Sequence, residues 1–141
     1  MLSRLIYASK ALVKMDYAEL RRINDQAVRA NSTQGVTGLL MYGQSCFLQV
    51  LEGGRAEISE TLHRIAQDKR HHELVLIGLS EIAERSFHDW AMRFVMIDGV
   101  NEPKTAAMLM KFGTSGQFLP ALFSDGSAHG FLLAHSREFA A

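Results

Sequence analysis

Cysteine is almost missing from this 141-residue chain, in which Cys46 is the single example. One thiol cannot form an intramolecular disulfide, and its apolar strand context favours a reduced, buried side chain. Net charge is missing as well, because 15 Lys and Arg residues balance 15 Asp and Glu residues. A surface that binds nucleic acid normally carries a basic excess, so we expect no nucleic-acid partner.

Long apolar runs and targeting signals are also absent. No run approaches the roughly 20 apolar residues of a membrane span, so we expect no membrane partner. Ser3 and Arg4 interrupt the first apolar stretch, which does not fit a signal peptide. Together with the lone cysteine, these features predict a cytoplasmic protein.

The common signatures of metal and phosphate sites are not found either. No glycine-rich phosphate-binding motif is present. His71 and His72 are adjacent, which is a poor geometry for two ligands on one helix face, and His63 and His88 have no partner at metal spacing. We therefore expect no metal site.

The hydrophobic pattern, in contrast, is informative, and the length suits one domain with a proper core. It predicts strands at 4–9, 73–84 and 90–97, a hairpin at 35–53, and helices at 16–31 and 53–72. The resulting βαββαββ order predicts an α+β, ferredoxin-like sandwich, in which two helices cover one face of a mixed five-stranded sheet. Strand 73–84 is apolar on both faces, so we expect it to be central.

The hairpin is predicted to turn at Gly43 and Gln44, since glycine in the first central position suits a type II′ turn. That turn would set Gly38 opposite Gln49 and Leu40 opposite Phe47. A glycine facing the glutamine would leave room beside its amide.

Residues 98–141 form a separate C-terminal extension after a first unit at 1–97. A helix is expected from the possible cap Asn101, through Pro103, to Gly113, followed by one or two short helices. The segment is too apolar for a linker. We expect it to cover the open face of the sheet, to be buried between subunits, or both.

Polar side chains interrupt these apolar elements at a few positions. Gln49 shares a strand face with Phe47 and Leu51, where an unbonded amide would cost roughly 1–3 kcal/mol. Tyr7 lies on the first strand and Asn31 at the end of the first helical stripe. Taken singly, each is more often an ordinary core or helix-end residue. Together with Asp68, Arg70 and His71, expected to end the second helix, they predict a small-molecule groove between the helices and the sheet.

Five stretches in this order and spacing carry a resemblance to a known family. They are "RLIYAS" at 4–9, Asn31 with "GVTGLLMY" at 35–42, "FLQVLEG" at 47–53, "DKRHH" at 68–72 and "RSFHDWAMRF" at 85–94. Over about residues 1–97 the chain resembles the BLUF family, the blue-light sensors that use FAD.

The resemblance implies a role for each matching residue. Tyr7 matches the electron and proton donor to the excited flavin, Gln49 the amide between tyrosine and flavin, and Asn31 the side chain that holds the ring edge. Three further sets match positions that pack the ring (Ile23, Leu40, Phe47, Ile65), positions at the ribityl and phosphate end (Asp68, Arg70, His71), and positions that relay the signal (Trp90, Met92, with Ser9 as a neighbour).

The implied protein is a short photoreceptor and not an enzyme. It would bind FAD, with FMN or riboflavin fitting the same site, and a light-driven change in hydrogen bonding would alter a strand and the C-terminal helices. The apolar tail favours a homo-oligomer and a separate effector protein, for which a cyclic-dinucleotide enzyme is one option. Two alternatives stay open: a flavin-dependent redox enzyme, and a ligand-binding ferredoxin-like module without photoactivity.

Overall fold

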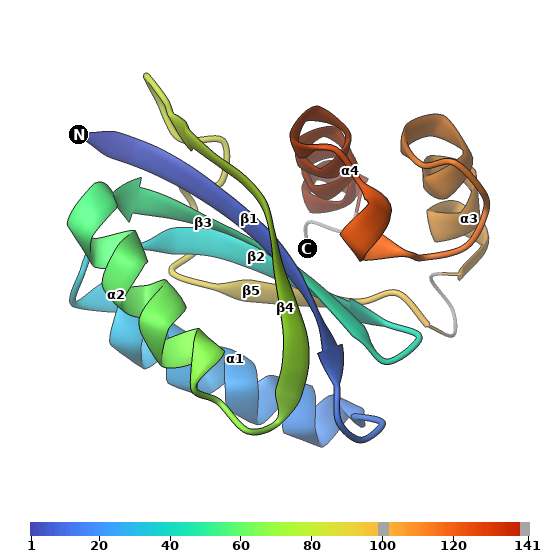
Figure 1. Cartoon of the computed structure of the whole chain (residues 1–141), viewed down its shortest axis with the longest axis horizontal. Helices are drawn as coiled ribbons and strands as arrows, with labels where there is room; N and C mark the ends of the chain where they lie inside the picture. Colours follow the sequence, from blue (N-terminus) through green and yellow to red (C-terminus); the bar gives the residue numbers. More distant parts are fainter. Residues whose placement is uncertain (99–101, 139–141) are drawn as a thin grey trace.

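A mixed five-stranded sheet forms the middle of the molecule (Figure 1). The structure is a computed structural model, which describes residues 1–98 and 102–138. The strands are β1 (Leu2–Ala11), β2 (Thr37–Gly43), β3 (Cys46–Gly54), β4 (His71–Glu81) and β5 (Arg93–Met96). They lie in the order β4-β1-β3-β2-β5, with β5 parallel to β2 and all other neighbours antiparallel. The predicted ferredoxin-like α+β fold is confirmed.

Helices cover both faces of this sheet (Figure 1). On one face lie α1 (Tyr17–Ser32) and α2 (Arg55–Ala66). On the other lie α3 (Glu102–Phe112), the short 3₁₀ helix η2 (Pro120–Leu122) and α4 (Asp125–Glu138). Gly113 follows α3 as predicted, whereas the expected cap Asn101 lies outside the described residues. None of the helices in the described ranges is long and apolar enough to cross a membrane.

The alternation of side chains along the strands divides the core into two clusters. Tyr7, Leu40 and Phe47 belong to the cluster beneath α1 and α2. Ile6 and Leu48 belong to the cluster on the opposite face. There they pack with buried residues of the C-terminal segment, namely Leu109, Phe118, Ala128, Phe131 and Leu132. The C-terminal segment therefore covers the open face of the sheet, as expected from its apolar character.

The β2–β3 hairpin differs from the prediction in its register. Its turn is centred on Gln44 and Ser45, whose φ values of 49° and 61° are those of a type I′ turn. Leu40 consequently lies opposite Gln49, and Gly38 lies opposite Leu51. Gly43 ends β2 instead of forming the turn. A Cβ at this position would lie 2.1 Å from Cγ1 of Ile97, so close packing and not turn geometry explains the glycine.

Two other predictions were wrong at the far end of the sheet. β4 is an edge strand and not a central one, with Leu76 and Leu79 more than half exposed. Leu74 packs against the core cluster beneath α1 and α2, and Ile77 packs against the cluster on the opposite face. The strand is therefore apolar on both faces, and a sequence pattern cannot distinguish this from a central position. The helix α2 ends at Ala66 and not near residue 72. Asp68 and Arg70 therefore lie in the turn that follows, and His71 begins β4.

Gly38 provides a test of this packing. A Cβ added there would lie 2.0 Å from the Val50 carbonyl oxygen, a backbone atom that cannot move aside. Gly38→Ala should lower the free energy of unfolding by about 1–3 kcal/mol, the usual cost of overpacking. Gly126→Ala is the matched control, since a Cβ there meets nothing within 4 Å. Denaturant unfolding measures both. Equal stability of the two variants would contradict the close approach at Gly38.

Candidate functional site

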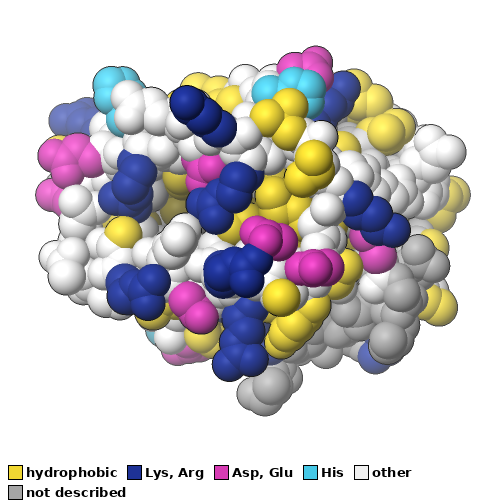
Figure 2. All heavy atoms as spheres, turned by 90° about the horizontal axis from the view of Figure 1, so that it is seen from below, with side chains coloured by type: hydrophobic (Ala, Val, Ile, Leu, Met, Phe, Trp, Pro, Cys, Tyr) yellow, Lys and Arg dark blue, Asp and Glu magenta, His cyan; other side chains and the backbone are white. Residues whose placement is uncertain are grey.

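A cavity of about 360 Å³ lies between α1, α2 and the sheet. Its walls are mainly apolar, and its polar groups come from β1, β3, the end of α1 and the turn after α2. The residues that line it are Tyr7, Ile23, Gln26, Ala27, Ala30, Asn31, Leu40, Phe47, Gln49, Thr61, Arg64, Ile65, Asp68, Arg70 and His71. On the side of the molecule that carries α1 and α2, charged side chains of both signs are interspersed with hydrophobic ones (Figure 2).

The floor of the cavity carries a hydrogen-bonded pair from neighbouring strands. The antiparallel register sets Tyr7 directly opposite Gln49, and the Tyr7 hydroxyl donates to Oε1 of Gln49. Both side chains are 4% exposed. Burial, together with the nearby carboxylate of Asp68, raises the pKa of the Tyr7 phenol far above its usual range. The phenol is therefore neutral and keeps its hydrogen for Gln49.

Gln49 is also bonded on its other side, to the residue that directly precedes the edge strand β5. Its Nε2 donates to Sδ of Met92, 3.4 Å away, and Met92 is buried. Trp90 instead lies half-buried, with the Arg93 guanidinium 4.9 Å from the centre of its ring. The residue that reaches the glutamine is thus Met92, just before β5.

Asn31 brings an unpaired acceptor to the same cavity. It is 1% exposed at the end of α1, and its Nδ2 donates to the Ala91 carbonyl at 3.0 Å. Its Oδ1 is buried and has no hydrogen-bond partner among the described residues. A buried acceptor without a donor is costly, so this atom points to a donor that a bound molecule would supply.

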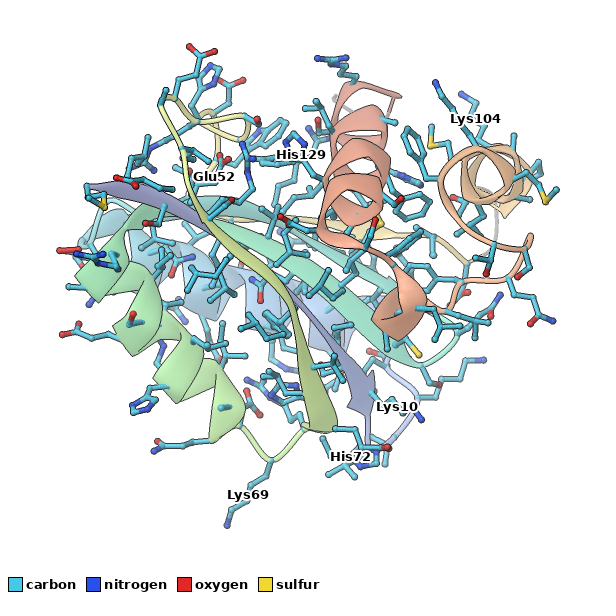
Figure 3. All side chains as sticks on the ribbon, turned by 45° about the horizontal axis from the view of Figure 1, so that its top comes forward. Lys10, Glu52, Lys69, His72, Lys104 and His129 are labelled. Atoms are coloured by element: carbon cyan, nitrogen blue, oxygen red, sulfur yellow. The ribbon has the colours of Figure 1, made fainter. Side chains whose placement is uncertain are left out.

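Charged groups line the mouth of the cavity. The Arg70 guanidinium donates to both carboxylate oxygens of Asp68 and to Oε1 of Gln26, at 2.5–3.1 Å. These hydrogen bonds from Arg70 lower the pKa of Asp68, which is therefore ionised. Lys69, between them, points away from the molecule (Figure 3). Successive side chains in this turn point in different directions, so Asp68 and Arg70 reach the cavity and Lys69 does not.

His71 ties β4 to β1 beside the cavity. Its Nε2 lies 2.6 Å from the Ile65 carbonyl oxygen, which can only accept, so Nε2 carries a hydrogen. In the neutral ring, Nδ1 then accepts from Oγ of Ser9 at 2.7 Å. The imidazole also packs edge-on to the ring of Phe47, with 6.2 Å between the ring centres. Ser9 thus acts on the cavity wall through His71.

Several cavity residues were missed by the sequence analysis, although a signal for them exists. Gln26, Ala27 and Ala30 lie one or two helical turns after Ile23 in α1. Thr61 and Arg64 lie in α2, within a turn of Ile65, and Arg64 adds a cation to the mouth. Helical spacing from Ile23 and Ile65 gives a signal for Gln26, Ala27, Ala30 and Thr61, whereas Arg64 is adjacent to Ile65 and has no such signal.

The arrangement suits a flat heteroaromatic ring with hydrogen-bonding edges. Apolar walls from two helices can hold the faces of such a ring, and the Asn31 and Gln49 amides can satisfy its polar edge. The Arg64 and Arg70 cations at the mouth suit a phosphorylated substituent, and the ionised Asp68 can accept hydrogen bonds from hydroxyl groups. Among residues 1–98 and 102–138, no group of three or more His, Cys, Asp or Glu side chains could hold a metal ion.

Comparison with known proteins gives a consistent result. The family model described as "BLUF: Sensors of blue-light using FAD" matches residues 2–93. The photoactivated adenylate cyclase subunit beta of Euglena longa is 33% identical over 92 residues, which are 64% of this chain and 11% of that protein. The chain therefore spans about a tenth of the length of this relative.

Two solved structures extend the similarity to the C-terminal helices. The photo-activated state of BlsA superimposes with a TM-score of 0.82 at 28% identity, over 94% of this chain and 92% of that one. The calcium and cy-diGMP complex of Klebsiella pneumoniae BlrP1 gives a TM-score of 0.71 at 26% identity, over 99% of this chain and 34% of that one. With the family model matching 2–93, around the cavity of Tyr7, Asn31 and Gln49, the chain belongs to the BLUF family, the sensors of blue light using FAD.

Proposed function

We propose that this chain is a blue-light photoreceptor that holds FAD between α1 and α2 and signals through the bonding state of Gln49. The observation that carries the proposal is the chain of hydrogen bonds from Tyr7 through Gln49 to Met92. It lies beside the unpaired Oδ1 of Asn31. Through the single amide of Gln49, these hydrogen bonds join the floor of the cavity to the residue that precedes β5.

The residues present fit a flavin. Asn31 Oδ1 would accept from the N–H at the edge of the ring, and Ile23, Leu40 and Ile65 would hold its faces. Asp68, Arg70 and His71 would lie toward the ribityl and phosphate end. When bound, an oxidised flavin supplies the absorption of blue light and takes up an electron after excitation. FAD is the form that the family description favours, and FMN or riboflavin would use the same contacts.

Tyr7 would supply both the electron and the proton. Its phenol is neutral in the dark because burial raises its pKa. A phenol that has lost an electron is a strong acid, so its hydrogen would pass along the existing hydrogen bond to Gln49. Return of the electron and the proton to Tyr7 would leave no net reaction.

Gln49 can occupy two bonded states because the two ends of an amide differ. At present its oxygen accepts from Tyr7 and its nitrogen donates to Met92. Rotation of the amide would turn the oxygen toward the Met92 sulfur, which has no hydrogen to donate. That contact would then repel, so Met92 and the start of β5 would shift. Tautomerisation of the amide is a second route to a changed bond at the same place.

Residues 98–141 would pass the light signal on to a partner. The helices α3 and α4 of this segment pack on the sheet face away from the cavity, and Met110, Leu119 and Leu122 are exposed apolar side chains of the segment. We propose that this segment contacts a second copy of the chain or a separate effector protein in the cytoplasm. The similarity to a photoactivated adenylate cyclase and to a protein solved with cy-diGMP supports an effector that handles cyclic nucleotides or dinucleotides.

An absorbance spectrum tests the photoreceptor function directly. The purified protein should be yellow and show a small, reversible red shift under blue light. Tyr7→Phe should abolish the shift while flavin stays bound, since the phenyl ring keeps the packing but cannot supply a proton. Gln49→Glu should also abolish the shift or alter it grossly. Heat release of the cofactor followed by chromatography identifies the flavin, for which we expect FAD.

Tyr42→Phe is the matched control for this experiment. Tyr42 is buried in the same cluster, and its hydroxyl accepts from the backbone N–H of Met15 and does not line the cavity. Its loss should cost about 1 kcal/mol of stability and leave the red shift intact. A normal photocycle in Tyr7→Phe would overturn the proposed mechanism.

Met92→Leu tests the second bond of Gln49. Leucine keeps the volume of methionine but removes the sulfur acceptor that holds the dark orientation of the amide. We expect dark recovery to slow by about two- to fivefold, because a weak hydrogen bond that stabilises the dark state is lost. Met41→Leu is the control, since Met41 is buried on the opposite face of the sheet. Equal recovery rates in both variants would show that Met92 does not hold the dark state.

A further inference from the structure

The outer edge of β4 has no neighbouring strand among residues 1–98 and 102–138, because β4 stands first in the order β4-β1-β3-β2-β5. In Figure 1 this strand crosses the front of the molecule, and no helix lies in front of it. With 11 residues it is the longest strand of the described sheet. The backbone N–H and C=O groups along such an edge can pair with a further strand.

The side chains of β4 are apolar and exposed on both faces of the sheet. Leu76 and Leu79 are paired with β1 residues of the core cluster beneath α1 and α2, and they are 51% and 55% exposed. Val75 is paired with a β1 residue of the opposite cluster and is 42% exposed. Paired residues share a face, so apolar surface flanks the open edge on both sides.

The residues that usually protect an edge strand are missing from the middle of β4. No charged residue and no proline stands at positions 74–80, with the sequence "LVLIGLS". Two irregularities in the pairing with β1 add residues on the β4 side, but Gly78–Glu81 pair regularly. The sequence pattern is that of a central strand, whereas in the single chain the strand lies at the edge. A further strand added at this edge would remove the difference.

The two ends of β4 differ in charge. Glu81 and Glu84 are exposed at the C-terminal end. Lys10 and His72 lie side by side at the N-terminal end (Figure 3), where Glu73 contacts both. Antiparallel pairing of two β4 strands would bring Glu81 of one copy beside His72 of the other, whose ring N–H can donate to a carboxylate. Parallel pairing would instead bring the two acidic ends together.

We propose that the edge of β4 is a docking surface for a second copy of this chain, with the two β4 strands paired antiparallel across a two-fold axis. Such an interface uses the same patch on both copies. The two five-stranded sheets would become one continuous sheet with the β4 strands in its middle. The dimer goes beyond the proposed function and does not depend on photochemistry. It leaves the exposed apolar residues of the C-terminal segment to an effector.

Sedimentation velocity of the full chain in the dark, over a series of concentrations, tests the dimer. Leu76→Lys should raise the dissociation constant about tenfold or more, because each dimer loses two apolar contacts and gains two charges at the joined edge. Leu79→Lys should act in the same way and provides the test if Leu76→Lys does not fold. Leu122→Lys is the matched control, since it makes the same change at an exposed leucine outside β4 and should leave the constant unchanged.

An exchange of charges tests the antiparallel arrangement. His72→Glu alone would face Glu81 of the other copy, and Glu81→Lys alone would face His72 and Lys10. Each single change should raise the dissociation constant about three- to tenfold, since two cross-strand pairs are altered in each dimer. The variant that carries both changes restores opposite charges and should regain most of the affinity. Equal weakening in the single and double variants would overturn the antiparallel pairing.

Amide hydrogen exchange locates the interface on the chain. Protection of residues 74–80 should rise with protein concentration in the unmodified chain and not in Leu76→Lys. The proposal is overturned if the unmodified chain stays monomeric up to about 1 mM. It is also overturned if a dimer forms that Leu122→Lys dissociates while Leu76→Lys and Leu79→Lys do not. Failure of the photoreaction would leave these dark measurements unaffected.

Discussion

The antiparallel register between β1 and β3 is the constraint on which the polar pairs of both sheet faces depend. It sets Tyr7 opposite Gln49 and Arg4 opposite Glu52. The pairs are three residues apart on each strand, an odd number, so they face opposite sides of the sheet. The first pair forms the floor of the cavity. On the opposite face, Glu52 of the second pair accepts from the backbone N–H groups of Ser86 and Phe87. A register slip of one residue would exchange the two faces and destroy both pairs.

The segment from Ser86 to Met92 connects the two sides of the sheet. Glu52 holds its beginning through backbone N–H groups, and Gln49 holds its end through the Met92 sulfur. Between them, Asn31 binds the Ala91 carbonyl. The segment is short and bonded at both ends, so in the mechanism proposed for Gln49 it would carry a displacement of Met92 toward the opposite face of the sheet.

The errors in the predicted sheet are instructive because they did not move the site. The hairpin register was wrong by two residues, and an even shift leaves every side chain on its original face. Gln49 was therefore placed correctly beneath α1 and α2, although its cross-strand neighbour is Leu40 and not Gly38. The position of β4 was wrong for a different reason. β4 is apolar on both faces, with Leu74 packed against one core cluster and Ile77 against the other, although it lies at the edge of the sheet.

The sequence by itself determined the elements, the faces of their side chains and the polar residues that interrupt the apolar strands. These follow from local periodicity, which acts over a few residues. Only the tertiary structure decided the strand order, the pairing of Gln49 with Met92, and the unpaired Oδ1 of Asn31. Each of these features depends on residues far apart in the chain and on how whole elements pack against one another. No local sequence pattern encodes such packing.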